Sequence, residues 1–194
     1  CVTERAGIGM GDAVVVQGLG LLGLYGAAIA KARGARLVIG LDTVAARREL
    51  GAKFGVDHAL DPASMDEAGL VATVRALCQP EGADVVLEVC GYPEVVPSGI
   101  RFLRNGGRYV LGGVVNPDAF VSIDVNQILR KLITLRGVHN YHPRNLIEAL
   151  DFVQANRKRF PFHDLVDGKY RLEEIGRAFK DAGERRVLRA AIVP

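Results

Sequence analysis

Short apolar runs alternate with longer stretches of helical spacing along most of this chain. The near-continuous Val, Ile and Leu content of these runs is typical of strands buried on both faces of a parallel sheet. The runs predict six main strands, at residues 13–17, 36–41, 57–60, 84–90, 108–112 and 132–138. Apolar residues at helical intervals predict the helices between and after them, at residues 20–33, 44–54, 62–78, 93–103, 124–131 and 144–156. This alternation predicts an α/β fold with a doubly wound, six-stranded parallel sheet, which binds ligands outside the carboxyl ends of its strands.

The smaller features of the pattern are a turn, an edge strand and a tail. Residues 105–107 (NGG) are typical of a turn before the fifth strand, and the alternation at 119–123 indicates an edge strand. Beyond residue 156 the regular alternation ends. A predicted helix at 172–182 and an apolar run at 187–193 do not make another strand-helix-strand unit.

The first strand runs into the pattern G-x-G-x-x-G, made by Gly18, Gly20 and Gly23. In a dinucleotide site the first glycine allows the tight turn, the second lets the backbone approach a pyrophosphate, and the third lets the helix lie close to the sheet. The free N–H groups of the first helical turn, at Leu21 and Leu22, then face the phosphates. The pattern alone is weak, because 23 of the 194 residues are glycine, so its surroundings decide its meaning.

The second strand supplies that context, because it ends in Asp42, roughly 20 residues beyond the glycines. A carboxylate at this strand tip holds the adenosine ribose diol of NAD by two hydrogen bonds. The alternative is a glycine-rich turn in some other α/β domain, in which Asp42 only caps the helix at 44–54. The complete strand-turn-helix-strand unit favours dinucleotide binding.

Composition excludes several other classes of function. The chain is 49% hydrophobic and 24% charged with a formal net charge of +3, which is typical of a globular protein of one domain, or of one domain plus a fragment. The 25 basic residues are interspersed with 22 acidic ones, so nucleic acid is not an expected partner. No apolar run is long enough to span a membrane and no secretory leader opens the chain, so we expect a cytoplasmic protein without membrane association.

The cysteines and histidines form no metal or catalytic motif. Cys1, Cys78 and Cys90 are widely spaced, without a C-x-x-C pair or a nearby histidine, so we expect neither a disulfide framework nor a zinc site. Cys90 closes an apolar run, which favours a small buried residue over a nucleophile. His139 and His142 follow the sixth strand, where they either contact a cofactor or substrate or cap a loop. No partner acid is identifiable, which favours the loop role.

Several stretches of the chain form a joint pattern. They are 11–23 (GDAVVVQGLGLLG), Asp42 with Arg47 and 54–57 (FGVD), 84–91 (DVVLEVCG), 106–113 and the tail from residue 160 to 175. In this combination the whole chain resembles the C-terminal part of the medium-chain, zinc-dependent alcohol dehydrogenases. Within that family, residues 137–143 (GVHNYHP) are most similar to dehydrogenases proposed for phosphonate metabolism.

The resemblance implies a domain organisation. Residues 1–160 would form a dinucleotide-binding Rossmann domain, and residues 161–194 a C-terminal strip of a GroES-like catalytic domain. In this family the zinc ligands, the proton relay and most of the substrate pocket lie in an N-terminal GroES-like part, to which nothing here corresponds. We therefore assign no catalytic residue and no metal ligand in this chain, Cys1 included, and expect zinc only in a full-length enzyme.

The expected cofactor is NAD, held at the carboxyl ends of the strands. Near the pyrophosphate and the adenosine we expect Gly18, Gly20, Leu21, Leu22, Gly23, Asp42 and Arg47. Near the adenine or its ribose we expect Val89, Cys90 and Gly91. Around the nicotinamide ribose and amide we expect Gly112, Gly113, Val114, Gly137, Val138 and His139. NADP is less favoured, because Asp42 would face its 2′-phosphate as a like charge. Arg47 and Arg48 keep that option open, since either could pair with a phosphate.

The leading hypothesis is hydride transfer between NAD and an alcohol or aldehyde in a longer enzyme, of which this chain alone would be inactive. One alternative is a stand-alone nucleotide-binding or redox-sensing module. Another is a zinc-free, quinone-reductase-like enzyme of the same superfamily, which Asp42 disfavours because those enzymes more often use NADPH. The edge patterns at 120–123 and 133–136, together with the resemblance, predict a homodimer or a higher homo-oligomer.

Overall fold

The structure, a computed structural model, describes residues 1–194. Its strands are β1 (Ala13–Gln17), β2 (Leu37–Leu41), β3 (His58–Leu60), β4 (Ala83–Glu88), β5 (Leu103–Leu111), β6 (Thr134–Gly137), β7 (Gly168–Tyr170) and β8 (Ala190–Ile192). Its α-helices are α1 (Val2–Arg5), α2 (Leu21–Ala32), α3 (Ala45–Lys53), α4 (Glu67–Leu77), α5 (Val96–Phe102), α6 (Val125–Arg130), α7 (Pro143–Asn156) and α8 (Ile175–Gly183). Short 3₁₀ turns lie at Pro62–Ser64, Pro93–Val95, Phe162–Leu165 and Leu172–Glu174. None of the helices has both the length and the apolar character needed to cross a bilayer.

The first six strands form one parallel sheet in the order β3-β2-β1-β4-β5-β6. All five residues of β1 are buried, as a continuous apolar run in a central strand requires. The strand order reverses between β1 and β4, which defines the topological switch point where such sheets bind ligands. The predicted α/β fold with a doubly wound, six-stranded parallel sheet is confirmed.

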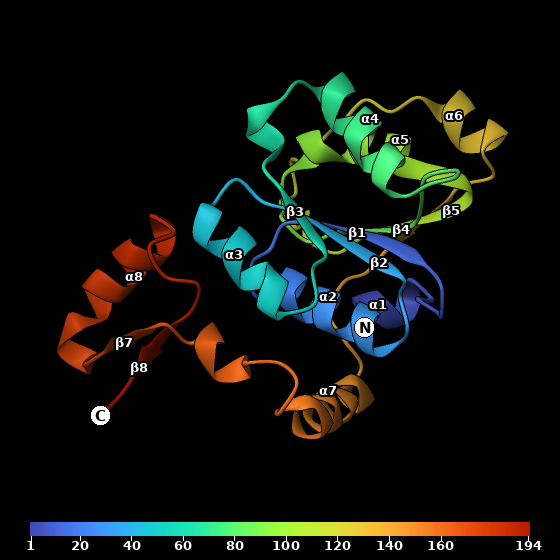
Figure 1. The fold of residues 1–194 in the computed structure, drawn as a ribbon. Coiled ribbons are helices and arrows are strands. Elements are labelled where there is room, and N and C mark those ends of the chain that lie inside the picture. Colours follow the sequence, from blue (N-terminus) through green and yellow to red (C-terminus); the bar gives the residue numbers. More distant parts are fainter. The chain divides into compact units, whose positions relative to one another are not determined.

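Helices cover both faces of the sheet (Figure 1). On one face, α4 and α5 pack onto alternate strand residues, and Val15, Ile39 and Val86 belong to the same buried cluster as Val74 and Ile100 of these helices. On the other face lie α2 and α3. The small residues of α2 let it approach closely, since a Cβ at Gly26 would lie only 3.4 Å from Leu87. Both faces are therefore covered, and ligand access is left to the strand ends.

The structure corrects the prediction of an edge strand at 119–123. This segment pairs with no strand, and Phe120 is 87% exposed. Of its apolar residues, only Ile123 packs against the core. Alternation of apolar and polar residues creates a strand only where a partner strand is available, and this segment finds none.

Several boundaries also differ from the prediction, and three of them have a local cause. The fourth strand ends at Glu88 rather than at Cys90, because Gly91 has a φ of +81° and turns the chain away from the sheet. Residues 105–107 lie within β5, where the register with β4 shifts and Gly106 has a φ of +72°, so the predicted turn is a bulge. Residues 62–64 form a separate 3₁₀ turn, and α4 begins after its own N-cap, Asp66.

Contacts divide the chain into two units, Cys1–Ala149 and Leu150–Pro194. Within the second unit, β7 and β8 pair in parallel, and the Tyr170 hydroxyl donates a hydrogen bond to Asp181 of α8 at 2.9 Å. The helix α8 and the turn before it expose apolar side chains at Leu172, Ile175 and Phe179. The assignment of residues 161–194 to a catalytic domain stays a prediction.

Candidate functional site

The turn between β1 and α2 contains three glycines whose missing side chains serve different purposes. Gly18 has a φ of +96°, and a Cβ there would lie 2.6 Å from the Cβ of Cys90. A Cβ at Gly23 would lie 1.8 Å from the carbonyl oxygen of Gly18, so the first turn of α2 packs directly on the loop. A Cβ at Gly20 would meet nothing closer than Nη1 of Arg47, at 4.0 Å. Gly18 and Gly23 close the turn, whereas Gly20 leaves space at the start of α2.

The amino end of α2 borders this space without a side-chain cap. Gly20 is the N-cap residue, so the first-turn N–H groups, among them those of Leu21 and Leu22, have neither a side-chain nor an intrahelical acceptor. The first turn carries no acidic residue, and Leu22 is exposed. The helix dipole adds partial positive charge here. The backbone can therefore bind an anion such as a pyrophosphate.

Asp42 follows β2 and connects the glycine turn to the start of α3. Its Oδ2 accepts a hydrogen bond from the Leu19 N–H at 2.8 Å, and its Oδ1 accepts one from the Val44 N–H at 2.8 Å. The residue is only 8% exposed. Because a carboxylate has about four acceptor positions, each oxygen retains room for a further donor. The carboxylate thus bridges two loops and can also accept two hydrogen bonds from a ribose diol.

The two neighbouring arginines are placed differently. Nη1 of Arg47 lies 3.8 Å from Oδ2 of Asp42 and is also the atom nearest to the open position at Gly20. Arg48 instead donates to the carbonyl of Asp42 at 2.8 Å and forms an ion pair with Asp61 at 3.1 Å. Arg47 is therefore the cation beside the open space. We call the group of Gly20, the α2 amino end, Asp42 and Arg47 the cradle.

The loops that follow β4 and β5 lie against each other beside the cradle. The first contains Val89, Cys90 and Gly91, and the second contains Gly112, Gly113 and Val114. The Gly112 N–H donates to the carbonyl of Glu88 at 2.9 Å, and a Cβ at Gly113 would lie 2.7 Å from the nitrogen of Gly91. Cys90 contacts Gly18 on its other side. The two loops therefore form one continuous wall that reaches the glycine turn.

A third loop continues this wall at the end of β6. Gly137 closes β6, and the Val138 N–H donates to the carbonyl of Leu111 at 2.8 Å, so this segment runs on beside β5. His139 is exposed. His142 lies at the start of α7, where its Nδ1 accepts a hydrogen bond from the Arg144 N–H at 3.3 Å. This hydrogen bond is consistent with the loop-capping role favoured for His142, which stays a prediction.

The thiol of Cys90 and the hydroxyl of Tyr109, both near the site, remain protonated near neutrality. Burial raises the pKa of the Cys90 thiol to about 11, and this thiol donates to Oε1 of Glu88 at 3.5 Å. Burial also raises the pKa of the Tyr109 hydroxyl, which donates to the side chain of Gln17 at 2.7 Å. Both are internal hydrogen-bond donors, so neither supplies a nucleophile or a base.

No three His, Cys, Asp or Glu side chains within residues 1–194 gather into a group that could hold a metal ion.

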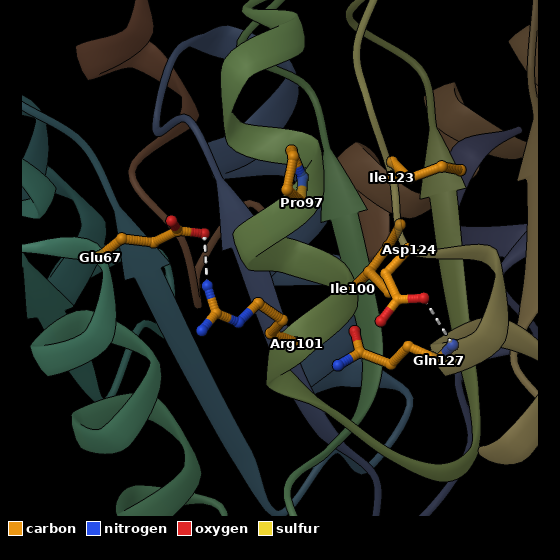
Figure 2. Close-up of a pocket in the computed structure, with 7 residues that line it drawn as sticks. All are labelled: Glu67, Pro97, Ile100, Arg101, Ile123, Asp124 and Gln127. Carbon is orange, nitrogen blue, oxygen red and sulfur yellow. Dashed lines mark hydrogen bonds and ion pairs between the residues drawn. The ribbon is translucent and has the colours of Figure 1, made fainter.

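A surface pocket of about 370 Å³ lies away from the cradle, between α4, α5 and the start of α6 (Figure 2). It is lined by Glu67, Pro97, Ile100, Arg101, Ile123, Asp124 and Gln127. Its charged groups are already engaged. Arg101 pairs with Glu67 at 3.0 Å, and Asp124 accepts from the N–H groups of Asn126 and Gln127 as the α6 cap. None of the predicted cofactor residues lines this pocket.

The structure brings the predicted residues together in a row along the carboxyl ends of β2, β1, β4, β5 and β6. Sequence reasoning missed Glu88, whose side chain accepts hydrogen bonds from both wall loops. The available signal was a single acidic residue inside the apolar run VVLEVC. A charged residue at such a position needs several hydrogen-bond partners, and these lie in a distant part of the sequence.

Known proteins match nearly all of this chain but only about half of their own length. The family model for zinc-binding dehydrogenases matches residues 22–155. The geraniol dehydrogenase of Castellaniella defragrans is 34% identical over 190 residues, which cover 96% of this chain and 49% of that enzyme. An alcohol dehydrogenase structure from Thermotoga maritima superposes with a TM-score of 0.90 at 26% identity, covering 96% of this chain and 51% of that one.

A third relative was solved with a bound cofactor. A Sinorhizobium meliloti structure with a TM-score of 0.88 and 25% identity, covering 98% of this chain and 55% of its own, was solved bound to NADP. The chain thus spans about half the length of the relatives it matches. Because the family model covers more than half of the chain and the matching relatives are dehydrogenases, this chain belongs to the zinc-binding dehydrogenase family of oxidoreductases and corresponds to its cofactor-binding C-terminal part.

Proposed function

We propose that this chain binds NAD as the cofactor part of a zinc-dependent alcohol dehydrogenase. The observation that carries the proposal is the cradle: Gly20 faces open space at an uncapped helix start, with Asp42 and Arg47 beside it. A pyrophosphate accepts hydrogen bonds from the α2 amino end, and the ribose diol donates to Asp42. When bound, the nicotinamide cofactor supplies the hydride chemistry; the chain supplies its position.

In this proposal the loop after β4 lies between the two halves of the cofactor, and the loops after β5 and β6 hold the nicotinamide half. A dinucleotide crosses the switch point of a doubly wound sheet, so an adenosine at β2 places the nicotinamide riboside over β4 and β5. Gly91 and Gly113 lie against each other and have no side chains, so backbone groups line this part of the site. Gly137 has no atom within 4 Å of a Cβ position, so the β6 loop also has room for a ligand.

NAD is preferred over NADP in this proposal because Asp42 carries negative charge where the 2′-phosphate would lie. Arg48 is already paired with Asp61, so Arg47 is the arginine left to compensate a phosphate beside Asp42. One relative was solved bound to NADP, so the preference of this chain for NAD over NADP needs its own test.

The binding proposal is tested with Gly20→Ala and a matched variant, Gly9→Ala. Both positions accept a Cβ without a clash, but only Gly20 lies in the cradle. We expect Gly20→Ala to weaken NADH binding at least tenfold, about 1.4 kcal/mol, while Gly9→Ala leaves it unchanged. The chain contains no tryptophan, so NADH emission is measured without transfer from protein indole. Equal NADH affinity in both variants and the unmodified protein contradicts the cradle as the cofactor site.

The substrate, the zinc and the catalytic residues belong, in this proposal, to a longer protein that moves hydride between NAD and an alcohol or aldehyde. The residues here form no metal site, and α8 exposes an apolar face that a larger catalytic domain would cover. The test is the intact mass of the natural polypeptide, followed by zinc analysis. A mass far above 20.9 kDa supports the proposal, whereas a mass near 20.9 kDa favours a stand-alone nucleotide-binding module. A cytoplasmic location stays a prediction.

We further propose that the protein is a homodimer or a higher homo-oligomer assembled through the free edge of β6. This strand ends the sheet, and all four of its residues are exposed. The preceding helix α6 and the turn after it expose apolar side chains at Val125, Leu129 and Leu132. A free strand edge of this kind is stabilised when another chain pairs with it.

A further inference from the structure

Glu88, the last residue of β4, is fully buried and accepts four backbone hydrogen bonds. Its Oε1 accepts from the N–H groups of Cys90 and Gly91, at 3.0 and 2.7 Å. Its Oε2 accepts from the N–H groups of Gly113 and Val114, at 3.0 and 3.1 Å. Each carboxylate oxygen therefore accepts the hydrogen bonds of one of the two wall loops. One carboxylate joins segments that lie more than 20 residues apart in the sequence.

The space around this carboxylate is filled by the two loops themselves. A Cβ on Gly113 would lie 2.7 Å from Oε1 of Glu88, and a Cβ on Gly91 would lie 3.0 Å from the carbonyl oxygen of Gly113. A buried carboxylate is tolerated only when its oxygens are fully hydrogen-bonded. Four backbone donors meet that requirement, so the loops are held at a spacing that the carboxylate determines.

We infer that Glu88 is a positioning residue for the nicotinamide half of the cofactor, an inference that rests on the proposed NAD function. The adenosine end of the cradle is organised by Asp42, which shares no hydrogen-bond partner with Glu88. The loops that Glu88 joins lie on the other side of the switch point, where the nicotinamide riboside is proposed to bind. Loss of the carboxylate therefore loosens the two wall loops and leaves the hydrogen bonds of Asp42 in place.

The test compares Glu88→Gln with Asp84→Asn. A glutamine keeps the size of Glu88 but turns one acceptor oxygen into an NH₂ donor, which faces two N–H donors of one loop. Asp84 lies near the opposite end of the same strand, where its carboxylate also accepts a backbone hydrogen bond, from Ala13 at 2.7 Å. The control thus removes a carboxylate from β4 that is partly exposed and pairs with Arg104, without touching the wall loops.

Affinities are measured for NADH and for ADP, which lacks the nicotinamide riboside. In Glu88→Gln we expect NADH affinity to fall at least tenfold and ADP affinity to change less than threefold. In Asp84→Asn we expect the ratio of the two affinities to stay within threefold of that of the unmodified protein. Parallel losses of NADH and ADP in Glu88→Gln contradict the positioning role and leave the proposed NAD function standing. Failure of the unmodified protein to bind NADH overturns the proposed function itself, and with it the positioning role.

A second measurement covers the case in which Glu88→Gln does not fold. Hydrogen exchange on the unmodified protein follows the N–H groups of residues 90, 91, 113 and 114, which share one acceptor side chain. We expect all four to be protected and to open with one common protection factor, and NADH to raise that factor more than ADP does. Unprotected or independently exchanging groups, or equal protection by both ligands, overturns the inference.

Discussion

Carboxylates at strand ends repeatedly accept backbone N–H groups in this protein. Asp42 and Glu88 do so at the carboxyl ends of β2 and β4. Asp57 and Asp84 do so near the opposite end of the sheet, accepting from Val38 and Ala13 at 2.7 Å each. A parallel ladder stops at these ends and leaves donors that need partners. An acidic residue at a strand end therefore has a structural role whether or not it binds a ligand. In the proposed function Asp42 has this structural role and also binds the ribose of the cofactor.

Replacing Asp42 separates these two tasks. We expect Asp42→Asn and Asp42→Ala to raise the affinity for NADPH relative to NADH about tenfold, or about 1.4 kcal/mol, because the like charge facing the 2′-phosphate is removed. The alanine variant is also expected to lose roughly 1–3 kcal/mol of stability, since the buried N–H of Leu19 loses its acceptor. Titration with both cofactors and urea unfolding measure the two effects.

The control for this prediction is Asp57→Asn, which removes a carboxylate that accepts from the Val38 N–H and pairs with Lys31 at the opposite end of the sheet. Its ratio of NADPH to NADH affinity is expected to match that of the unmodified protein. An unchanged ratio in both Asp42 variants would show that charge at this strand tip does not select the cofactor.

At the scale of elements, local patterns predicted the strands and helices well, and long-range contacts explain the errors. The order of elements and the glycine turn follow from residues close in sequence, so the pattern of Gly18, Gly20, Gly23 and Asp42 is recognisable in the sequence alone. The contact of Gly18 with Cys90 depends on residues that only the fold brings together. The same is true of Glu88 and its second loop, and of the missing partner for residues 119–123.

The packing of α2 on the glycine turn gives an element-scale prediction. In Gly23→Ala the new methyl group meets the carbonyl oxygen of Gly18 at 1.8 Å, a backbone atom that cannot move aside without opening the turn. We expect a loss of about 3 kcal/mol or more in the free energy of unfolding. Gly26→Ala, one turn along the same helix, adds a methyl group 3.4 Å from the flexible end of Leu87 and gains helix propensity. Urea unfolding should find it within about 1 kcal/mol of the unmodified protein. Similar stabilities for the two variants would contradict the close packing.

The contact between α1 and the start of α7 predicts a pH dependence. Glu4 accepts hydrogen bonds from Asn145 at 3.0 Å and from Arg144 at 2.6 Å. The hydrogen bond from Asn145, followed by the charge of Arg144, lowers the pKa of Glu4 below its ordinary value of 4.5. A lowered pKa in the folded state means that the contact stabilises the protein above pH 4.5 and that this contribution is lost as the pH falls through the lowered pKa.

Comparison of the unmodified protein with Glu4→Gln measures this contribution. We expect the difference in unfolding midpoint between the two proteins to be constant at neutral pH and to shrink as the pH falls below 4.5. Glu49→Gln, on α3, is a control that removes a glutamate from another helix. A difference between the unmodified protein and Glu4→Gln that stays the same from neutral pH to about pH 3 would exclude Glu4 as the titrating group.

At the scale of the whole molecule, the two edges of the six-stranded sheet differ. At one edge β3 has only three residues. At the other edge all four residues of β6 are exposed, and α6 and the turn before β6 expose apolar side chains. A free edge beside exposed apolar side chains favours pairing with a second chain, and charged residues on the edge oppose such pairing. The molecule thus carries one edge suited to self-association, on the side of the sheet away from Asp42.

We therefore expect the purified chain to elute as a dimer at micromolar concentration, with light scattering giving about twice the chain mass. Leu135→Lys places a charge on β6 itself and should shift the protein to monomer, because pairing would bring the two lysines of a symmetric edge close together. Met10→Lys adds the same charge at a residue that is 91% exposed and lies before β1, so it should leave the dimer intact. Added salt should weaken the dimer little, because the flanking contacts are apolar. A monomer in the unmodified protein would contradict self-association, and dissociation by both substitutions alike would place it elsewhere than at β6.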